Sequence, residues 1–257
     1  MTSPAVRDEA VLAIGLRPGT RACLFDLDGV LTRTAVVHAQ AWKQAFDAFL
    51  HERAERTGTP FVPFDAVSDY DEYVDGEPRL DGVRSFLASR GIELSEGDAA
   101  DRPGTETVHG LGERKNELLL ELIERDGVET YEGSVRYVHA VRDAGLRRAV
   151  VSSSENCREM LEAAGISDLF EVRIDGIVAE QQGLRGKPAP DTFLAAARAL
   201  DVVPAEAAVF EDALAGVAAG RAGDFGFVVG VDRAGQAEAL RSHGADIVVD
   251  DLTELLQ

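Results

Sequence analysis

The chain has 257 residues, 45% of them hydrophobic, and a formal net charge of −20. That length is enough for one large domain or two modest ones, and the acidic balance argues against nucleic acid or an anionic membrane as a partner. Two cysteines cannot make a disulfide framework, and the sequence lacks both the long apolar run of a membrane helix and the basic start of a signal peptide. We therefore expect a cytoplasmic protein, and we also expect a monomer.

A short apolar run near the N-terminus ends in two carboxylates. After a lead-in over residues 1–20, Cys23–Phe25 is followed at once by Asp26 and Asp28, which indicates a buried strand that delivers carboxylates into a turn. Open α/β sheets bind ligands at the carboxyl ends of their strands, and close carboxylates need a cation or a transferable proton. An EF-hand calcium loop does not fit, because Val37 stands where that loop needs a glutamate. A metal site, an acid or base, or both are predicted here.

The next segment, 34–128, has a mostly helical pattern. Apolar residues at helical spacing over 35–50, including Val36 and Trp42, predict a helix with one buried face. Further helical patterns lie around residues 64–73, 82–89 and 113–125. Glycine, proline and acidic residues separate these patterns, and no convincing strand lies between them. We therefore expect a helical cap domain over 34–128, inserted directly after Asp28.

From residue 129 onward, helices and strands alternate. The patterns predict helices over 133–144, 155–164, 191–200, 213–222 and 234–242, and strands over 148–151, 170–178, 207–210, 225–231 and 246–249. Repeated helix and strand units imply a parallel sheet with helices on both faces. The predicted fold is therefore α/β, with a Rossmann-like parallel-sheet core made of 21–33 and 129–257 and interrupted by the helical cap.

Polar side chains follow several of the predicted strands, where catalytic groups gather in a parallel sheet. The strands are followed by Asp26 and Asp28, by Ser152, and by Glu211 and Asp212, and the loop before the helix over 191–200 adds Lys187. Each has an ordinary structural explanation, because serines often cap helices, acidic residues favour helix N-termini and loop lysines are usually solvated. Their conjunction at successive strand ends nevertheless favours one site with a carboxylate cluster, a hydroxyl and a cation.

These residues stand in motifs that resemble a known superfamily. The sequence has Asp26-Leu27-Asp28-Gly29-Val30, then Ser152, then Lys187-Pro188-Ala189-Pro190-Asp191, and then Glu211-Asp212 followed by Ala215-Gly216. This order resembles the four-motif set of the haloacid dehalogenase superfamily. Within that superfamily the chain is similar to the β-phosphoglucomutases through Thr34, His38, Ala41-Trp42-Lys43, Asp75-Gly76 with Arg79, Arg114-Lys115-Asn116 and Ser152-Ser153-Ser154-Glu155-Asn156.

The resemblance implies a role for each core residue. Asp26 would be the nucleophile that takes the phosphoryl group as an aspartyl phosphate, and Asp28 would be the general acid and base. Ser152 and Lys187 would hold the phosphoryl oxygens. The groups that would bind Mg²⁺ are the Asp26 carboxylate, the Asp28 backbone carbonyl and Asp212, with Glu211 close by or reaching the ion through water.

The resemblance also assigns substrate selection to the cap, because a closing cap would keep water from the aspartyl phosphate. Arg79 would bind the distal phosphate of a small phosphorylated sugar together with Ser154 and Asn156. The implied reaction interconverts β-glucose 1-phosphate and glucose 6-phosphate through a bisphosphate. The alternative is a sugar-phosphate phosphatase that uses the same site. A signalling receiver is disfavoured, since such a domain needs no large helical insertion after its first strand.

Four further cap positions have roles implied by the resemblance. His38 and Lys115 would help hold Asp28 in its working position, and Thr34 would lie at the hinge. Trp42 would border the substrate pocket. A histidine on a helix face can equally be a space-filling residue, and Trp42 is also a natural packing residue of the cap.

Two positions depart from the β-phosphoglucomutase pattern. Arg33 stands where an acidic residue commonly separates two threonines, and Glu155 stands where a lysine is common. Glu155 would bring an anion near the proposed distal-phosphate site. Either its carboxylate turns away or the ligand differs.

Overall fold

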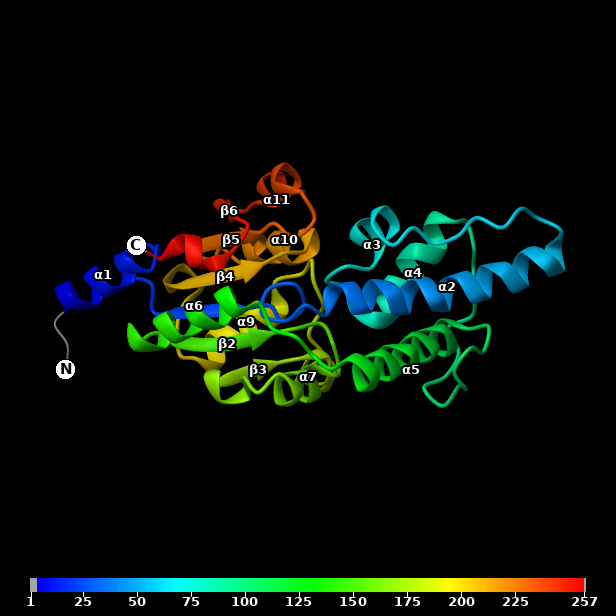
Figure 1. Ribbon diagram of the computed structural model, residues 1–257, viewed down its shortest axis with the longest axis horizontal. Coiled ribbons are helices and arrows are strands. Elements are labelled where there is room, and N and C mark those ends of the chain that lie inside the picture. The colour runs from blue at the N-terminus through cyan, green and yellow to red at the C-terminus, as the bar shows by residue number, and fades with distance from the viewer. Residues whose placement is uncertain (1–3, 257) are drawn as a thin grey trace. The chain divides into compact units, whose positions relative to one another are not determined.

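The core of the protein is a parallel β-sheet. The computed structural model describes residues 4–256, and the six strands of the sheet stand in the order β3-β2-β1-β4-β5-β6, with every neighbouring pair parallel. The strands are β1 Ala22–Phe25, β2 Arg147–Val151, β3 Val172–Ile174, β4 Ala207–Glu211, β5 Phe227–Val231 and β6 Ile247–Val249. Figure 1 traces this sheet. The predicted α/β fold is confirmed.

Strand β1 lies between β2 and β4, and its register with both of them brings the carboxyl ends of the three strands to the same level. Phe25, its last residue, pairs with Val150 of β2 and with Phe210 of β4. The residues that follow these three strands therefore emerge at the same edge of the sheet. All four residues of β1 are fully buried, which explains why the strand is apolar throughout rather than alternating.

Helices cover both faces of the sheet. Successive side chains of a strand point to opposite faces, and in β1 Leu24 belongs to a core cluster with Phe193 of α9, whereas the Phe25 ring contacts Tyr137 of α6 at 6.4 Å between centroids. The helices of this unit are α1 Pro4–Ala13, α6 Glu132–Asp143, α7 Cys157–Ala163, α8 Gly176–Gln182, α9 Asp191–Ala199, α10 Leu214–Ala222 and α11 Ala237–His243. In the described part of this unit, 3₁₀ turns lie at Ser167–Leu169, Pro204–Glu206 and Leu252–Leu255.

The N-terminal segment packs on the sheet unit rather than leading loosely into it. Val11, Ile14 and Leu16 are buried, and the Tyr137 hydroxyl donates a 2.9 Å hydrogen bond to the Ile14 carbonyl. The segment therefore contributes to the hydrophobic core.

The helices between the two parts of the core form their own unit, residues Thr34–Val128. They are α2 Ala35–Thr57, α3 Ser68–Tyr73, α4 Arg79–Ser89 and α5 Val108–Asp126. Three phenylalanines make the centre of this unit, with Phe46 and Phe86 at 4.2 Å and Phe64 and Phe86 at 5.0 Å between ring centroids. The insert thus has a hydrophobic core of its own.

The chain leaves the sheet unit and returns to it through two segments that lie side by side. The Arg33 amide donates to the Glu129 carbonyl at 2.8 Å, and the Tyr131 amide donates to the Leu31 carbonyl at 2.9 Å. An isolated antiparallel bridge joins Thr32 to the returning segment. The two connections are therefore paired where they meet the sheet unit.

Several element boundaries differ from the sequence expectation. The predicted strand 170–178 ends at Ile174, because Asp175 accepts a hydrogen bond from the Val178 amide and so caps α8. The helix expected over 64–73 begins only at Ser68, and Val36, expected on the buried face of its helix, is 74% exposed.

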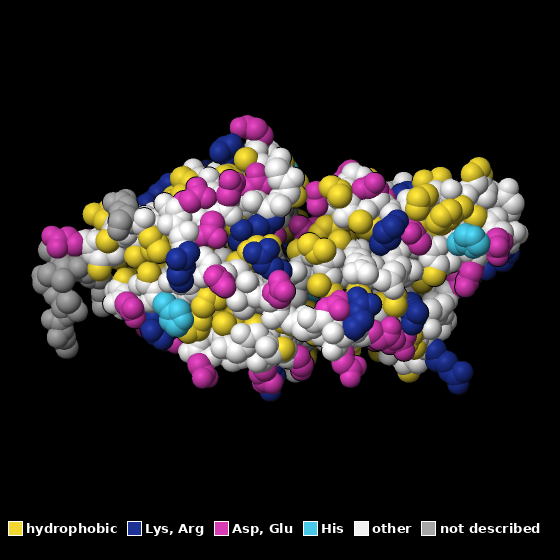
Figure 2. Space-filling view, viewed as in Figure 1, with side chains coloured by type: hydrophobic (Ala, Val, Ile, Leu, Met, Phe, Trp, Pro, Cys, Tyr) yellow, Lys and Arg dark blue, Asp and Glu magenta, His cyan; other side chains and the backbone are white. Residues whose placement is uncertain are grey.

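Among residues 4–256, no helix combines the length and the hydrophobicity needed to cross a membrane. Figure 2 shows acidic side chains spread over both units on the face in view, as expected for a chain of this charge.

Candidate active site

The turn after β1 is tightly hydrogen-bonded. The Asp26 amide donates to the Phe210 carbonyl at 3.0 Å, which continues the β1–β4 pairing by one residue. The Leu27 carbonyl accepts from the Leu31 and Thr32 amides, each at 2.9 Å. Gly29 has φ +84°, a conformation that favours glycine. The backbone thus holds Asp26 and Asp28 at the carboxyl end of the sheet.

Lys187 lies at the centre of the buried charges. Its Nζ donates to Asp26 Oδ1 at 2.5 Å, to a Glu211 carboxylate oxygen, and to the Val151 carbonyl at 3.3 Å. Burial acts to lower the pKa of Lys187, but the adjacent carboxylates of Asp26 and Glu211 raise it above its usual range. Lys187 is therefore a permanent cation that bridges β1, β2 and β4.

The single lysine does not balance the carboxylates around it. Burial raises the pKa of Asp26 well above its usual range, and the charges of Glu211 and Asp28 add to this rise while Lys187 opposes it. A second cation beside Asp26 would favour its ionised form, which is the form a nucleophile needs. A metal ion held beside these carboxylates would supply that second cation.

Three buried carboxylates provide a place for that ion. Asp26, Glu211 and Asp212 each offer an oxygen, and these oxygens all lie within 4.8 Å of one another. An all-oxygen set of carboxylates suits a hard divalent cation. The residues present therefore fit the metal dependence expected of the superfamily.

Two glycines make room for these carboxylates. A Cβ on Gly216 of α10 would lie 1.9 Å from Glu211 Oε1, and a Cβ on Gly29 would lie 1.6 Å from Asp212 Oδ2. Each carboxylate thus occupies space that the side chain of any residue other than glycine at these two positions would fill. Both glycines stand in the sequence motifs around Asp28 and after Asp212, but the space that they create depends on contacts that the motifs do not encode.

Ser152 belongs to the same cluster through the loop that follows β2. It is 2% exposed, and its Oγ donates to Asp28 Oδ2 across 3.5 Å, a long contact. The Ser154 amide donates to Ser152 Oγ at 3.1 Å, and the Asn156 amide donates to Ser154 Oγ at 3.2 Å. These side-chain to backbone bonds shape the loop 152–156 at the edge of the site. All six core residues singled out from the sequence therefore lie together.

The insert gathers three of its predicted residues into a second cluster. His38 Nδ1 lies 3.1 Å from Lys115 Nζ, and Lys115 Nζ lies 5.0 Å from the centre of the Trp42 ring. Because a lysine ammonium only donates, Nδ1 must be the acceptor, which places the proton of a neutral His38 on Nε2. Lys115 is 4% exposed and Trp42 3%. His38 thus accepts a hydrogen bond from the buried Lys115 within the insert.

Thr34 and Arg79, the other two predicted cap residues, lie at the starts of helices. Thr34 is buried immediately before α2. Arg79 begins α4 and forms an ion pair with Glu113 of α5 at 2.7 Å, with 15% of its side chain exposed. The guanidinium is thus oriented by a carboxylate of its own unit.

Arg33 and Glu155, the two residues that depart from the family pattern, each contact an identifiable residue in the structure. The Arg33 guanidinium lies 4.6 Å from the centre of the Tyr131 ring, so its replacement of an acidic residue creates a cation–π contact. The Glu155 side chain lies beside Gly176, since a Cβ on that glycine would come within 3.1 Å of Glu155 Cγ.

The sequence analysis missed two polar residues near the strand ends. Asp175, 1% exposed, follows β3 and binds Arg173 at 2.5 Å. Its signal was hidden because the predicted strand ran on to Val178. Arg233, which follows β5, donates to the Gly29 carbonyl at 2.8 Å. No sequence pattern predicts a contact between residues so far apart.

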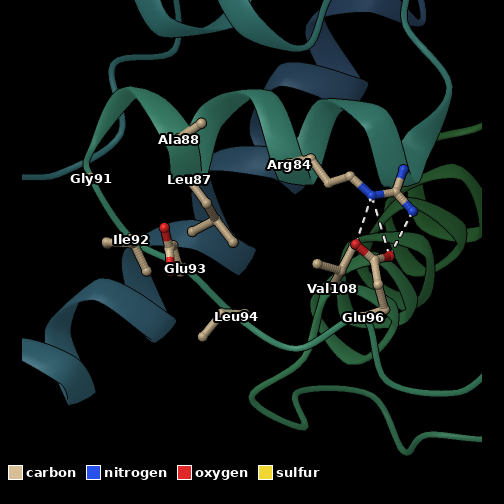
Figure 3. Close-up of a pocket in the computed structure, with 9 residues that line it drawn as sticks. All are labelled: Arg84, Leu87, Ala88, Gly91, Ile92, Glu93, Leu94, Glu96 and Val108. Carbon is tan, nitrogen blue, oxygen red and sulfur yellow. Dashed lines mark hydrogen bonds and ion pairs between the residues drawn. The ribbon is translucent and has the colours of Figure 1, made fainter.

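A cavity of about 440 Å³ in the insert is not part of either cluster. Figure 3 shows it between α4 and the segment that follows, with Leu87, Ile92 and Leu94 on its wall and Arg84 paired to Glu96. It is lined by none of the residues expected to act on a substrate.

Comparison with known proteins agrees with the chemistry of the site. The model of a family described as haloacid dehalogenase-like hydrolase matches residues 20–224. β-Phosphoglucomutase from Mycobacterium tuberculosis is 56% identical over 256 residues, covering 98% of this chain and 97% of that protein. Validoxylamine A 7′-phosphate phosphatase from Streptomyces hygroscopicus subsp. limoneus is 30% identical over 91% of this chain and 95% of that protein.

Comparison with solved structures shows that the fold is similar to that of a β-phosphoglucomutase. β-Phosphoglucomutase from Clostridium difficile has a TM-score of 0.72 and 28% identity, and the alignment covers 92% of this chain and 93% of that one. The family match spans most of the chain and includes every core residue of the site. The chain therefore belongs to the haloacid dehalogenase-like hydrolase family.

Proposed function

We propose that the protein is a Mg²⁺-dependent β-phosphoglucomutase that interconverts β-glucose 1-phosphate and glucose 6-phosphate. The observation that carries this choice is the 56% identity to a β-phosphoglucomutase over 98% of the chain. The geometry supports the reaction class, because a strand-end carboxylate, a buried lysine and an oxygen-rich cation site are what phosphoryl transfer needs.

Asp26 is the proposed nucleophile. Its carboxylate attacks the phosphorus of the substrate and becomes an aspartyl phosphate, which splits a difficult transfer into two easier steps. Lys187 already contacts Asp26, so its charge lies where negative charge develops on the phosphoryl oxygens. Ser152, on the neighbouring strand end, provides a hydroxyl donor to the same group.

Asp28 is the proposed general acid and base. It protonates the sugar oxygen that leaves phosphorus and then takes the proton from the hydroxyl that attacks the aspartyl phosphate. Asp28 is less buried than Asp26, and Ser152 Oγ lies 3.5 Å from its Oδ2. Two aspartates in one turn can therefore divide nucleophilic and proton-transfer roles.

The proposed metal ligands are the carboxylates of Asp26 and Asp212 and the backbone carbonyl of Asp28, with Glu211 beside them. Bound there, Mg²⁺ supplies charge neutralisation for the transferring group. The buried carboxylate oxygens within 4.8 Å of one another support this assignment.

The insert is proposed to select the sugar phosphate. Arg79, Ser154 and Asn156 hold the distal phosphate, and the His38 and Lys115 pair helps to hold Asp28 during transfer. Thr34 serves the hinge, and Trp42 borders the sugar pocket. The ion pair of Arg79 with Glu113 and the bond between Lys115 and His38 orient these groups within the insert.

A phosphatase is the second candidate. A relative named as a phosphatase is 30% identical over nearly the same length, so the core residues are compatible with hydrolysis. The two reactions differ only in what attacks the aspartyl phosphate, a sugar hydroxyl or water.

One experiment separates the candidates. Purified protein receives β-glucose 1-phosphate, Mg²⁺ and a trace of glucose 1,6-bisphosphate, and glucose 6-phosphate and free phosphate are followed together. We expect glucose 6-phosphate to form and Asp26→Asn to abolish it. Phosphate release without isomerised sugar would contradict the mutase assignment and favour the phosphatase, whereas phosphorylation of Asp26 without turnover would contradict both.

A further inference from the structure

Arg233 follows β5 in a loop that is held rigidly by one aspartate. Asp232 Oδ1 accepts hydrogen bonds from the Gly235 amide at 2.7 Å and the Gln236 amide at 2.9 Å. The Asp232 amide donates to the Val249 carbonyl at 2.8 Å, which ties the loop to the end of β6. These hydrogen bonds therefore hold the backbone from which the Arg233 side chain extends.

The Arg233 guanidinium joins three segments that are distant in sequence. Its Nε donates to the Gly29 carbonyl at 2.8 Å, and its Nη1 donates to the Asp250 carbonyl at 2.6 Å. Its central carbon lies 3.6 Å from the centre of the Tyr131 ring. A planar, permanently charged guanidinium can stack its face on a ring while its N–H groups donate in its own plane to carbonyls on both sides.

One of these segments carries Asp28, and a second is hydrogen-bonded to the residues that follow it. Gly29 directly follows Asp28, so a hydrogen bond to its carbonyl fixes the peptide next to the proposed acid and base. Tyr131 lies on the segment through which the chain returns from the insert, and its amide is bonded to Leu31. Arg233 therefore connects the Asp28 turn to the connecting segments.

The same loop also contacts the second carboxylate turn. Gln236 Nε2 donates to the Asp212 backbone carbonyl at 3.3 Å. The loop 232–236 thus contacts the backbone of both turns that carry proposed metal ligands.

We propose that Arg233 is a positioning residue, which sets the Asp28 turn by binding the Gly29 carbonyl while its guanidinium stacks on Tyr131. The inference rests on the proposed role of Asp28 as acid and base. Arg233 itself touches neither substrate nor metal in this proposal. Its effect appears in the proton-transfer steps, because a displacement of about 1 Å in a catalytic group can slow a reaction on the order of 10²-fold.

One feature argues against a purely structural anchor. Arg233 Nη2 is buried and has no hydrogen-bond partner among residues 4–256. A guanidinium selected only for stability would be expected to satisfy its buried donors. The position of Arg233 is instead set by the Gly29 and Asp250 carbonyls and the Tyr131 ring.

Arg17 provides a matched control in the same unit. Its guanidinium lies 4.6 Å from the centre of the Phe227 ring, and its Nη1 donates to the Gly226 carbonyl at 2.6 Å. Arg233→Met removes a cation–π contact and bonds to two backbone carbonyls. Arg17→Met removes a cation–π contact, one bond to a backbone carbonyl and the 3.1 Å ion pair with Asp246. Only Arg233 contacts the Asp28 turn.

The test compares Arg233→Met and Arg17→Met by steady-state kinetics and thermal unfolding. We expect Arg233→Met to lower kcat about tenfold while KM changes by less than about twofold, because positioning is lost and ground-state binding is kept. Arg17→Met should stay within about twofold of the wild-type kcat, and Arg233→Lys should recover part of the loss. Equal losses in the two methionine variants, an unchanged kcat in Arg233→Met, or a change confined to KM would overturn the proposal.

A second pair of variants covers the case in which Arg233→Met does not fold. Tyr131→Phe keeps the ring under the guanidinium and should retain the wild-type kcat, whereas Tyr131→Leu removes the ring and should lower kcat several-fold. Equal activity of these two variants would overturn the proposal. If the wild type releases phosphate and forms no glucose 6-phosphate, the proposed mutase function fails, while the same comparisons on phosphate release still decide the role of Arg233.

Discussion

Lys187 Nζ lies 2.5 Å from Asp26 Oδ1, and the side chains of both residues are almost completely buried. The same ammonium contacts Glu211, whose side chain has no exposed surface. Taking charges out of water is costly, so these groups are tolerated only because each has an opposite charge beside it. The site is therefore assembled around an ion pair that fixes three strand ends together.

Removing the lysine charge should cost both stability and activity. Lys187→Met leaves Asp26 and Glu211 as buried carboxylates without their cation, and we expect a loss of about 3–5 kcal/mol in the free energy of unfolding. Turnover should be undetectable in protein that still folds. Denaturant unfolding measures the first effect, and Arg21→Met, which breaks the exposed pair with Glu206 at 3.0 Å, is the control that should lose far less. Similar losses in the two variants would mean that the buried pair is not special.

Asp28 should be separable from the metal site. Asp28→Asn keeps the backbone carbonyl that is the proposed ligand, so we expect the fold and Mg²⁺ binding to persist while turnover falls on the order of 10²-fold. Calorimetric Mg²⁺ titration and the sugar-phosphate assay check the two halves of this prediction. Near-normal turnover in this variant would remove Asp28 from the acid and base role.

Magnesium should stabilise the folded protein through Asp26, Glu211 and Asp212. A ligand that binds only the native state at about 100 times its Kd adds about 2.7 kcal/mol of stability. We therefore expect Mg²⁺ to raise the Tm of the wild type, and Asp212→Asn to weaken this response. An equal rise in both proteins would place the ion elsewhere.

Gly216 should not tolerate alanine. The new Cβ would lie 1.9 Å from Glu211 Oε1, and that carboxylate cannot move without leaving Lys187. We expect Gly216→Ala to lower both Tm and turnover, the latter at least tenfold, by analogy with the cost of overpacking a buried site. Gly220→Ala on the same helix is the control, because the nearest atoms to its new Cβ would be Val209 Cγ1 and Val228 Cγ2, each at 3.3 Å. That variant should keep turnover within about twofold.

The insert should lose stability as the pH rises through neutrality. Burial raises the pKa of Glu77 to about 7, and the neighbouring Asp81 adds to the rise. A carboxyl whose folded pKa is raised binds its proton more tightly in the folded state, so its contribution is present below about pH 4.5 and is lost as the pH rises through about 7. Because Glu77 is only half-buried, solvent screening reduces the difference between pH 5 and pH 8 to roughly 1 kcal/mol.

Denaturant unfolding of the wild type and of Glu77→Gln between pH 5 and pH 8 tests whether Glu77 causes this pH dependence of stability. We expect the variant to be less dependent on pH and the more stable of the two at pH 8. Glu93→Gln, at an exposed position of the same unit, removes an equal charge and should leave the pH dependence nearly unchanged. Identical pH profiles for wild type and Glu77→Gln would contradict the raised pKa.

Local sequence patterns were sufficient to predict the parallel-sheet fold with its helical insert and the six polar residues proposed to carry the chemistry. The apolar run before Asp26, the alternation of helices and strands after residue 129 and the ordered strand-end residues Ser152, Lys187 and Glu211 all follow from short-range physics. A strand that is buried on both faces must be apolar, and the residue after it must be exposed to whatever lies at the sheet edge. These patterns predicted the α/β fold and six residues that the structure brings together.

Tertiary structure alone decided the contacts between distant segments. Lys187 pairs with two carboxylates rather than one, Gly216 provides the space for Glu211, and Arg233 reaches the Gly29 carbonyl across 204 residues of sequence. Such contacts depend on strand order and register, which periodicity along one segment does not encode. The sequence therefore determined which chemically competent side chains are present near the strand ends. The packing of the sheet decided which of them form ion pairs, fit beside a glycine or form hydrogen bonds with one another.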